Sequence, residues 1–166
     1  KVQKTPAVFD MTKLNWLNAQ YIKNGDANEI FNMALPLLEL AYPNLNKEYA
    51  KKVVKCLQDR MKLIIDVVPQ SEYFFNDNFI VNEEAKSKFI DKPGAKELMV
   101  KLKAKLGSID VFSHDKLEAV FKGLAEEAKI KSGEIIHPTR VLLTGRTESP
   151  GIYDVIEVLG KERTIK

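Results

Sequence analysis

The sequence predicts an all-α fold, and three observations support this. Apolar residues recur at steps of three or four along most of the chain, which is the spacing of one helix face. No segment shows the sustained alternation of a half-buried strand. The 8 glycines and 7 prolines lie mostly between the periodic segments, where they would start or end helices. With 45% hydrophobic and 30% charged residues in a chain of 166, a packed globular core is expected.

The first two helices are predicted from their capping residues. Asp10 or Thr12 can cap a helix over about residues 12–23, because their side-chain oxygens can accept from free backbone N–H groups. Asp26 is placed to cap a second helix. Pro36 should kink or break that second helix, so one bent helix and two short helices both fit the pattern.

The longest periodic segment covers residues 49–68 and predicts a single amphipathic helix that ends before Pro69. Arg60 falls on or beside its apolar stripe, which is an unusual place for a charge. A guanidinium keeps its charge there and can offer paired donors to a base edge or a phosphate. Alternatively, Arg60 extends to solvent or pairs with Asp66. The outer face of this helix carries three candidate phosphate contacts, Lys51, Lys52 and Lys55.

An aromatic stretch over residues 71–81 marks the predicted boundary between two helical subdomains, 1–81 and 82–166. Asn82 fits the cap of a helix over residues 83–90. The second subdomain is expected to contain further short helices, because the same alternation of caps, apolar periodicity and glycines continues.

The last forty residues are predicted to form two helices. Pro138 would occupy the first turn of one that ends at Gly145. Ser149-Pro150 would start another that ends at Gly160.

Arg140 lies just inside the first of these helices, and a turn containing Arg146, Ser149 and Pro150 follows. The free N–H groups and positive dipole end of the next helix would form a site for phosphate or base carbonyl groups. The alternative is an ordinary capped helix start that binds nothing.

Several classes of protein are excluded or disfavoured. Cys56 is the only cysteine, and no histidine or cysteine has metal-site spacing, so an intracellular chain without disulfide or metal is expected. No stretch reaches the ~20 apolar residues of a membrane helix. The motifs of nucleotide-binding loops, hydrolase elbows and zinc proteases are missing, and no acid/base or nucleophile set can be assembled. The excess of 26 basic over 23 acidic residues is too small to prove a polyanionic partner. Taken alone, these patterns leave an RNA-binding and a protein-binding module open.

Three segments together resemble the C-terminal half of bacterial-type glutamyl-tRNA synthetases, and the resemblance covers nearly the whole chain. They are FDMTKLNWLNAQYIK, QDRMKLIIDVVPQSEYFF and GEIIHPTRVLLTGRTESPGIYDVIEVLGKER. The last is the most specific, because many of its residues between Pro138 and Arg163 match in both identity and spacing. The family's catalytic Rossmann-type core carries HIGH-type and KMSKS-type motifs, and neither occurs here. We therefore expect the part of the enzyme that follows the catalytic core.

The resemblance implies a two-subdomain helical cage that grips the anticodon arm of the tRNA for glutamate, with residues near the start in a stem-contact region. Arg60 matches the position at which a family arginine reads the third anticodon base and favours C over the G of the glutamine tRNA. Arg140, Ser149, Pro150 and Ile152 match the cluster around the first two anticodon bases. Reading of unstacked loop bases by arginine and backbone donors is typical of RNA recognition.

For the parent enzyme, the resemblance implies activation of glutamate with ATP and Mg²⁺ and its transfer to the tRNA. This chain would contribute anticodon recognition as a cytoplasmic monomer, with no catalytic residue, cofactor, metal or membrane contact of its own. Phosphate contacts from Lys51, Lys52, Lys55 and Arg146 would add affinity without sequence choice. The alternative is a helical module that binds a partner helix in an apolar groove and has no RNA role.

Overall fold

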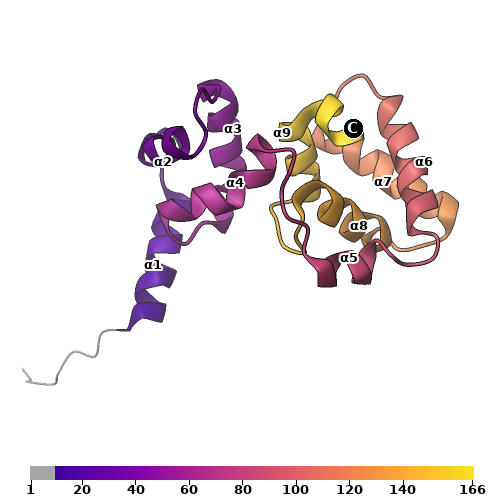
Figure 1. Ribbon diagram of the computed structural model, residues 1–166, viewed down its shortest axis with the longest axis horizontal. Coiled ribbons are helices and arrows are strands. Elements are labelled where there is room, and N and C mark those ends of the chain that lie inside the picture. Colours follow the sequence, from indigo (N-terminus) through magenta and orange to yellow (C-terminus); the bar gives the residue numbers. More distant parts are fainter. Residues whose placement is uncertain (1–9) are drawn as a thin grey trace, which may run out of the picture.

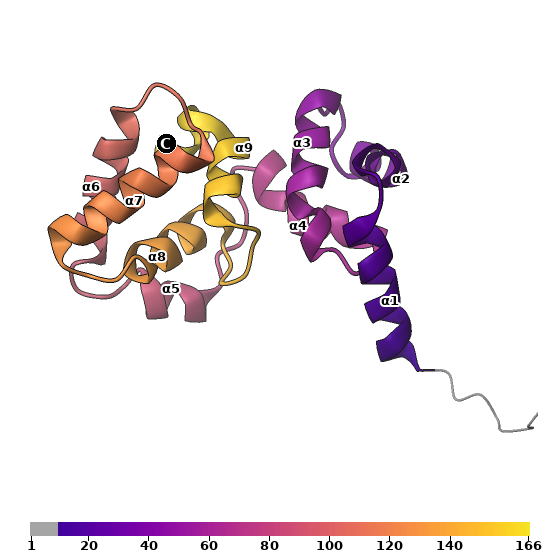
Figure 2. The same ribbon diagram turned by 180° about the vertical axis from the view of Figure 1, so that it is seen from behind.

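The computed structural model describes residues 10–166, and that part of the chain contains helices and no strand (Figures 1 and 2). The first group of elements is α1 (Met11–Asn24), α2 (Ala27–Ala41), α3 (Lys47–Leu57), η1 (Gln58–Arg60), η2 (Ile64–Asp66) and α4 (Val67–Phe75). The second group is α5 (Glu83–Phe89), α6 (Ala95–Gly107), α7 (His114–Ala128), α8 (Gly133–Thr144) and α9 (Ile152–Ile165). The all-α prediction is confirmed. The start of the expected stem-contact region, residues 1–9, lies outside the described residues.

Two hydrophobic cores hold these helices together. One is built mainly from α2, α3 and α4, with Leu38, Val53 and Phe74 at most 1% exposed. The other lies among α6 to α9, with Leu117 and Phe121 fully buried. Helix α9 contributes to both cores and lies between the two groups of helices in Figure 1. The cores are therefore joined by a shared helix as well as by the connecting segment 76–82.

The predicted capping residues are observed at several helix starts. The side chains of Asp10 and Asp26 each accept from two backbone N–H groups at the starts of α1 and α2. Asn82 caps α5 by accepting from the N–H of Ala85 at 2.8 Å. Pro36 lies inside α2, which continues as one helix, so the two-helix alternative is wrong.

The predicted continuous helix over residues 49–68 is wrong. Helix α3 ends at Leu57, a 3₁₀ turn follows, and α4 begins at Val67. Asp66 stabilises the break, because its Oδ2 accepts from the backbone N–H groups of Lys62 at 2.9 Å and Leu63 at 2.8 Å. Pro69 lies in the first turn of α4, where its missing N–H costs no intrahelical bond. It marks the start of a helix and not the end of one.

The last two helices also differ from prediction. Helix α8 begins at Gly133, so Pro138 lies in its second turn, where it is buried, and Arg140 lies deeper in the helix than expected. The end of α8 at Gly145 is as predicted, with the glycine in the left-handed region at φ 71°. Gly160 breaks the helical geometry of α9 at φ 75°, yet helical residues continue to Ile165. The predicted end at Gly160 is therefore a kink.

Candidate functional site

Arg60 lies at the end of the 3₁₀ turn between α3 and α4, where its side chain is exposed. Its neighbours fix the turn. The Gln58 side chain is buried, and its Nε2 donates to the carbonyl oxygens of Ile22 and Gly25, each at 2.9 Å. On the other side, Met61 is 1% exposed. Gln58 and Met61 anchor the backbone on both sides of Arg60. The backbone of the turn is therefore fixed, while the Arg60 side chain extends into solvent.

The expected alternative in which Arg60 pairs with Asp66 is wrong. The Asp66 carboxylate is used by the backbone of the following turn, and no ion pair of Arg60 occurs among residues 10–166. The carbonyl oxygen of Arg60 accepts from Gln70 Nε2 at 3.3 Å, which ties the turn to α4. The guanidinium itself is left available for a ligand.

Arg140 lies in α8 and is held by the turn that precedes α9. Its Nε donates to Ser149 Oγ at 3.0 Å, and Ser149 Oγ donates in turn to the carbonyl oxygen of Pro150 at 2.8 Å. The carbonyl oxygen of Arg140 accepts from Thr144 Oγ1 at 2.7 Å. This chain of bonds fixes the inner part of the guanidinium and uses neither terminal amino group.

Arg60 and Arg140 lie close enough to influence each other, although they come from different groups of helices. Burial lowers the pKa of Arg140 below its ordinary value, and the positive charge of Arg60 lowers it further. Nearby Tyr73 opposes this effect. An arginine stays protonated in proteins, so the positive charges of Arg60 and Arg140 repel each other. A negatively charged ligand, or one with hydrogen-bond acceptors, would reduce this repulsion.

Arg146 has a partly structural role. Its Nη2 donates to the carbonyl oxygen of Pro69 at 2.6 Å and lies 3.7 Å from Glu72 Oε2, so it connects the α8–α9 turn to α4. Pro150 is buried in the same turn, and Ile152, the first residue of α9, is 3% exposed. Pro150 and Ile152 thus form the buried part of the turn, while Arg140 and Ser149 are half-buried.

The start of α9 is less open to anions than the sequence suggested. Asp154 lies in its first turn, and its carboxylate packs against Gly151 and lies 3.1 Å from His114 Nδ1. A carboxylate at a helix N-terminus already satisfies the positive dipole end. The arginines, and not this helix end, are therefore the stronger anchors for a ligand.

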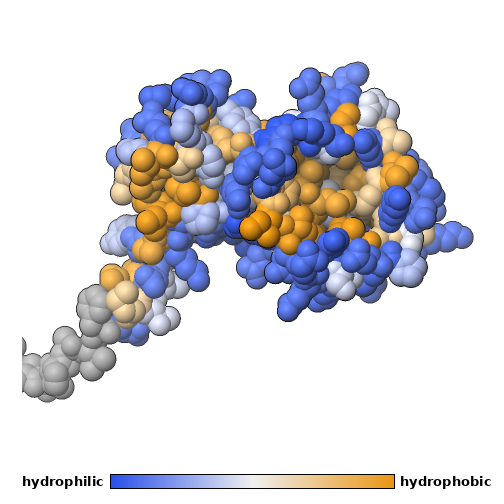
Figure 3. All heavy atoms as spheres, in the orientation of Figure 1, coloured by the Kyte–Doolittle hydropathy of each residue, from blue (hydrophilic) through white to orange (hydrophobic). Residues whose placement is uncertain are grey.

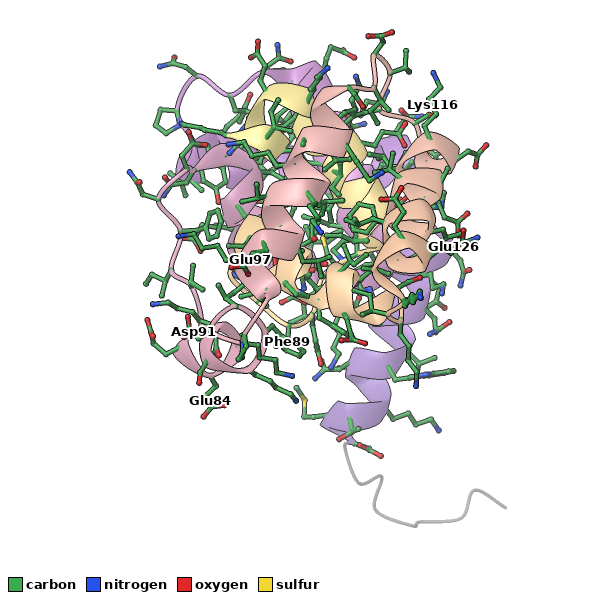
Figure 4. The ribbon with its side chains drawn as sticks, turned by 90° about the vertical axis from the view of Figure 1, so that its right-hand side faces the viewer. Glu84, Phe89, Asp91, Glu97, Lys116 and Glu126 are labelled. Carbon is green, nitrogen blue, oxygen red and sulfur yellow. The ribbon has the colours of Figure 1, made fainter. Side chains whose placement is uncertain are left out.

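The three lysines of α3 form an exposed basic face. Lys51, Lys52 and Lys55 are all exposed, and none of them forms an ion pair within the described part of the chain. Acidic residues lie at the surface as well. Figure 4 shows Glu84 and Glu126 pointing away from the body of the molecule.

No arrangement suited to bond chemistry appears in residues 10–166. No group of three or more metal-binding side chains is present, and no helix of this region is long and apolar enough to cross a membrane. Burial raises the pKa of the Cys56 thiol to about 12, which opposes a nucleophilic role. The ring of His137 stacks on that of Phe89, with 5.0 Å between the ring centroids. His137 is also far in the sequence from Cys56 and His114.

The model of a family described as "Anticodon binding domain" matches residues 29–166, which include both arginines and the turn that holds Arg140. The chain belongs to this anticodon-binding domain family. The family prediction made from the sequence is thus confirmed.

The chain is also similar to part of several glutamate–tRNA ligases. Glutamate–tRNA ligase 2 of Thermoanaerobacter pseudethanolicus is 34% identical over 100% of this chain and 35% of its own length. The glutamate–tRNA ligase of Geotalea uraniireducens is 36% identical over 99% of this chain and 35% of its own length. The chain thus spans about a third of the curated relatives it matches, and the catalytic domain of the ligase is absent from it.

Solved structures of glutamate tRNA ligases contain a region with the fold of this chain. A crystal structure of a glutamate tRNA ligase from Elizabethkingia meningosepticum, in complex with its amino acid, superposes with a TM-score of 0.86 at 27% identity. It covers 99% of this chain, which corresponds to 32% of that chain. The synthetase from Elizabethkingia anophelis gives a TM-score of 0.83 at 26% identity. The two groups of helices are therefore arranged as in glutamate–tRNA ligases.

Sequence reasoning missed the supports of the site. It identified Arg60 and Arg140 but gave no role to Gln58, whose long-range bonds to the end of α1 have no local signal. It also gave no role to Tyr73, which is 3% exposed and influences the pKa of Arg140.

Proposed function

We propose that this domain binds the anticodon arm of the tRNA for glutamate, within a ligase that attaches glutamate to that tRNA. ATP and Mg²⁺ supply the activation of glutamate in such a ligase, and they would bind outside this chain. The domain alone would be inactive in ligation and would contribute binding and orientation. In this proposal it acts in the cytoplasm as a monomer, with two subdomains divided at residues 81 and 82.

One observation carries the proposal: neither Arg60 nor Arg140 has a carboxylate partner among the described residues. Arg60 is exposed and Arg140 is half-buried, and the positive charge of Arg60 helps to lower the pKa of Arg140. Such a pair is unfavourable without a ligand that accepts hydrogen bonds. Unstacked anticodon bases offer such acceptors on their edges, and the RNA backbone offers phosphates.

We assign Arg60 to the third anticodon base. The Watson–Crick edge of cytosine presents two adjacent acceptors, N3 and O2, to the donors of a guanidinium. The same edge of guanine presents N–H donors that would oppose Arg60. A well-placed arginine contact discriminates by ~1–3 kcal/mol, about ten- to a hundredfold.

We assign the first two anticodon bases to Arg140 and its turn, with Ser149, Pro150 and Ile152. Because Ser149 holds the Nε of Arg140, both terminal amino groups remain for a base. The exposed lysines of α3 and the remaining donors of Arg146 would contact phosphates. These contacts would add affinity without choosing a sequence.

The test is fluorescence anisotropy with two labelled anticodon stem-loops that differ only in C or G at the third anticodon position. We expect the wild-type domain to prefer the C loop and Arg60→Ala to abolish that preference. Arg60→Lys is the matched control, because it keeps the charge and loses the paired donors; it should retain most affinity and lose most of the preference.

Two results would overturn the proposal in different ways. Equal binding of both loops by the wild type would remove Arg60 as the reader of the third base and favour a ligase that also charges the glutamine tRNA. Absence of binding at low salt would favour the alternative of a protein-interaction module.

A further inference from the structure

A cavity of about 560 Å³ opens on the second group of helices, between α6, α8 and α9. Figure 3 shows it as a hydrophobic hollow bordered by hydrophilic residues. Its apolar wall is formed by Met99, Leu102, Leu106, Leu142, Leu143 and Leu159. None of Arg60, Arg140 and Arg146 lines it, so it is separate from the arginine site.

The size and the mouth of the cavity suit a small ligand. Its volume lies in the range of ~300–1,000 Å³ that is typical of ligand pockets. Val100 and Leu142 lie at the mouth with 61% and 47% of their surface exposed, although both belong to ordered helices. An apolar ligand would remove this surface from water, which is favourable in proportion to the area covered.

The rim of the cavity is positively charged. Four basic residues and one acidic residue line it, namely Lys96, Lys103, Arg163, Lys166 and Asp77. Asp77 already pairs with Arg163 at 2.8 Å and with Lys166 at 2.7 Å. Lys103 donates only to the carbonyl oxygen of Lys166 at 3.3 Å, and neither Lys96 nor Lys103 has a carboxylate partner within residues 10–166. The uncompensated charge at the rim favours an anion over a cation.

The wall also contains two hydroxyl groups without partners. Tyr73 Oη and Thr164 Oγ1 are buried and form no hydrogen bond among the described residues, and both residues line the cavity. Buried hydroxyls usually have a partner. A ligand with a hydrogen-bonding group could supply a partner for Thr164 Oγ1 after a small change in the Thr164 side-chain conformation.

We propose that this cavity binds a small amphipathic anion, with an apolar chain or ring seated among the leucines and one carboxylate at the lysine rim. The apolar wall provides affinity, and Lys96 and Lys103 provide the preference for negative charge. This site is independent of the proposed contact with tRNA.

The test is isothermal titration calorimetry with three probes that share one twelve-carbon chain, each below its micelle concentration. They are dodecanoate, dodecanol and dodecyltrimethylammonium. We expect saturable binding of dodecanoate, at least tenfold tighter than that of the ammonium probe, with dodecanol between them. Equal binding of the anion and the cation, or no saturable binding of dodecanoate, would overturn the proposal.

Two pairs of variants locate the binding. Lys103→Glu should weaken dodecanoate at least tenfold, whereas Lys116→Glu, an exposed lysine of α7, should have no effect. Leu142→Glu, at the mouth of the cavity, should also weaken dodecanoate binding at least tenfold. Leu40 is 84% exposed on α2, and Leu40→Glu should leave the binding unchanged. Circular dichroism confirms that each variant is folded. If the members of either pair behave alike, the probe binds elsewhere.

A second copy of this chain is the competing occupant of the cavity. Sedimentation velocity distinguishes it, because a dimer that Leu142→Glu dissociates would make this face an interface between copies and overturn the proposal. Binding of the anticodon stem-loop should be unchanged by Leu142→Glu. The cavity and the arginine site can therefore fail independently.

Discussion

The Nε of Arg140 donates a hydrogen bond to Ser149 Oγ at 3.0 Å, across the turn between α8 and α9. Arginine has five N–H donors, and this bond engages one of them and leaves the two terminal amino groups unused. In the proposed complex, Ser149 would act on a base through the position of Arg140.

We therefore expect Ser149→Ala to reduce the affinity for the anticodon stem-loop by about 0.5 to 1.5 kcal/mol, the range of a typical hydrogen bond. Ser149→Thr keeps the hydroxyl and should restore most of this loss. Ser108→Ala is the matched control, because Ser108 Oγ donates only to the carbonyl oxygen of Lys105. Equal behaviour of the alanine and threonine variants in the anisotropy titration would show that the hydroxyl does not position Arg140.

The basic face of α3 should control the salt dependence of binding. Replacing Lys51, Lys52 and Lys55 together by glutamine should lower the slope of log K against log salt by about 2 to 3, if each lysine neutralises one phosphate. The preference for C over G should not change. The same replacement of Lys116, Lys129 and Lys131, exposed lysines of the other subdomain, serves as the control. A slope unaffected by the α3 variant would exclude these lysines as phosphate contacts.

Gln58 should contribute to stability and to base preference together. Gln58→Ala removes the partner of the Gly25 carbonyl oxygen and leaves that of Ile22 with only the 3.3 Å bond from the Gly25 N–H, at a cost of ~1–3 kcal/mol in the free energy of unfolding. The turn that carries Arg60 would loosen, so discrimination at the third anticodon base should also fall. Urea unfolding and the stem-loop titration measure the two effects. Gln20→Ala, in α1, should change neither; a stable Gln58→Ala with full discrimination would contradict the role.

Asp77 should respond to acid later than an isolated aspartate. Hydrogen bonds from Lys166 and Arg163 lower its pKa below the ordinary value of 3.8. The unfolded chain binds the proton first as pH falls, so the stabilisation by Asp77 is complete above pH 3.8 and is lost below it, through the lowered pKa. Carboxyl ¹³C NMR should place its midpoint below 3.8, and Arg163→Gln should raise that midpoint. A midpoint unaffected by Arg163→Gln would show that the ion pair does not form in solution.

Cys56 should be protected from alkylation. Burial is the main cause that raises its pKa from 9.0 to about 12, with smaller contributions from Asp154 and Glu157, and this lowers the thiolate fraction about a thousandfold at pH 8. Iodoacetamide should therefore modify the folded protein far more slowly than the protein in denaturant, as followed by mass spectrometry. Similar rates in both states would mean that α3 opens readily.

Local signals predicted much of the fold, and tertiary contacts explain the rest. Asp26 and Asn82 cap helices as expected because a cap depends only on residues a few positions away. The break after Leu57 has no glycine or proline to announce it, since it is produced by Gln58 reaching the end of α1. Pro69 was misinterpreted because a proline can end one helix or occupy the first turn of another.

The same distinction applies to the candidate site. The sequence identified Arg60 through its odd place in the apolar pattern and Arg140 through the turn that follows it. Their mutual influence could not be derived from spacing, because it depends on how α9 packs against α3 and how Arg146 ties the α8–α9 turn to α4. Asp66 and Arg146 likewise bind backbone groups, which no side-chain pattern records.

Helix α9 also determines the order in which this chain can fold during its synthesis. Val155 and Leu159 belong to the core that otherwise contains residues between Ile22 and Phe74. At ~5–20 residues per second, the ribosome adds Leu159 about 4 to 17 s after Phe74. Until then the first group of helices lacks the two side chains that α9 adds to its core. The nascent chain therefore passes through an interval in which a chaperone can bind where α9 will later pack.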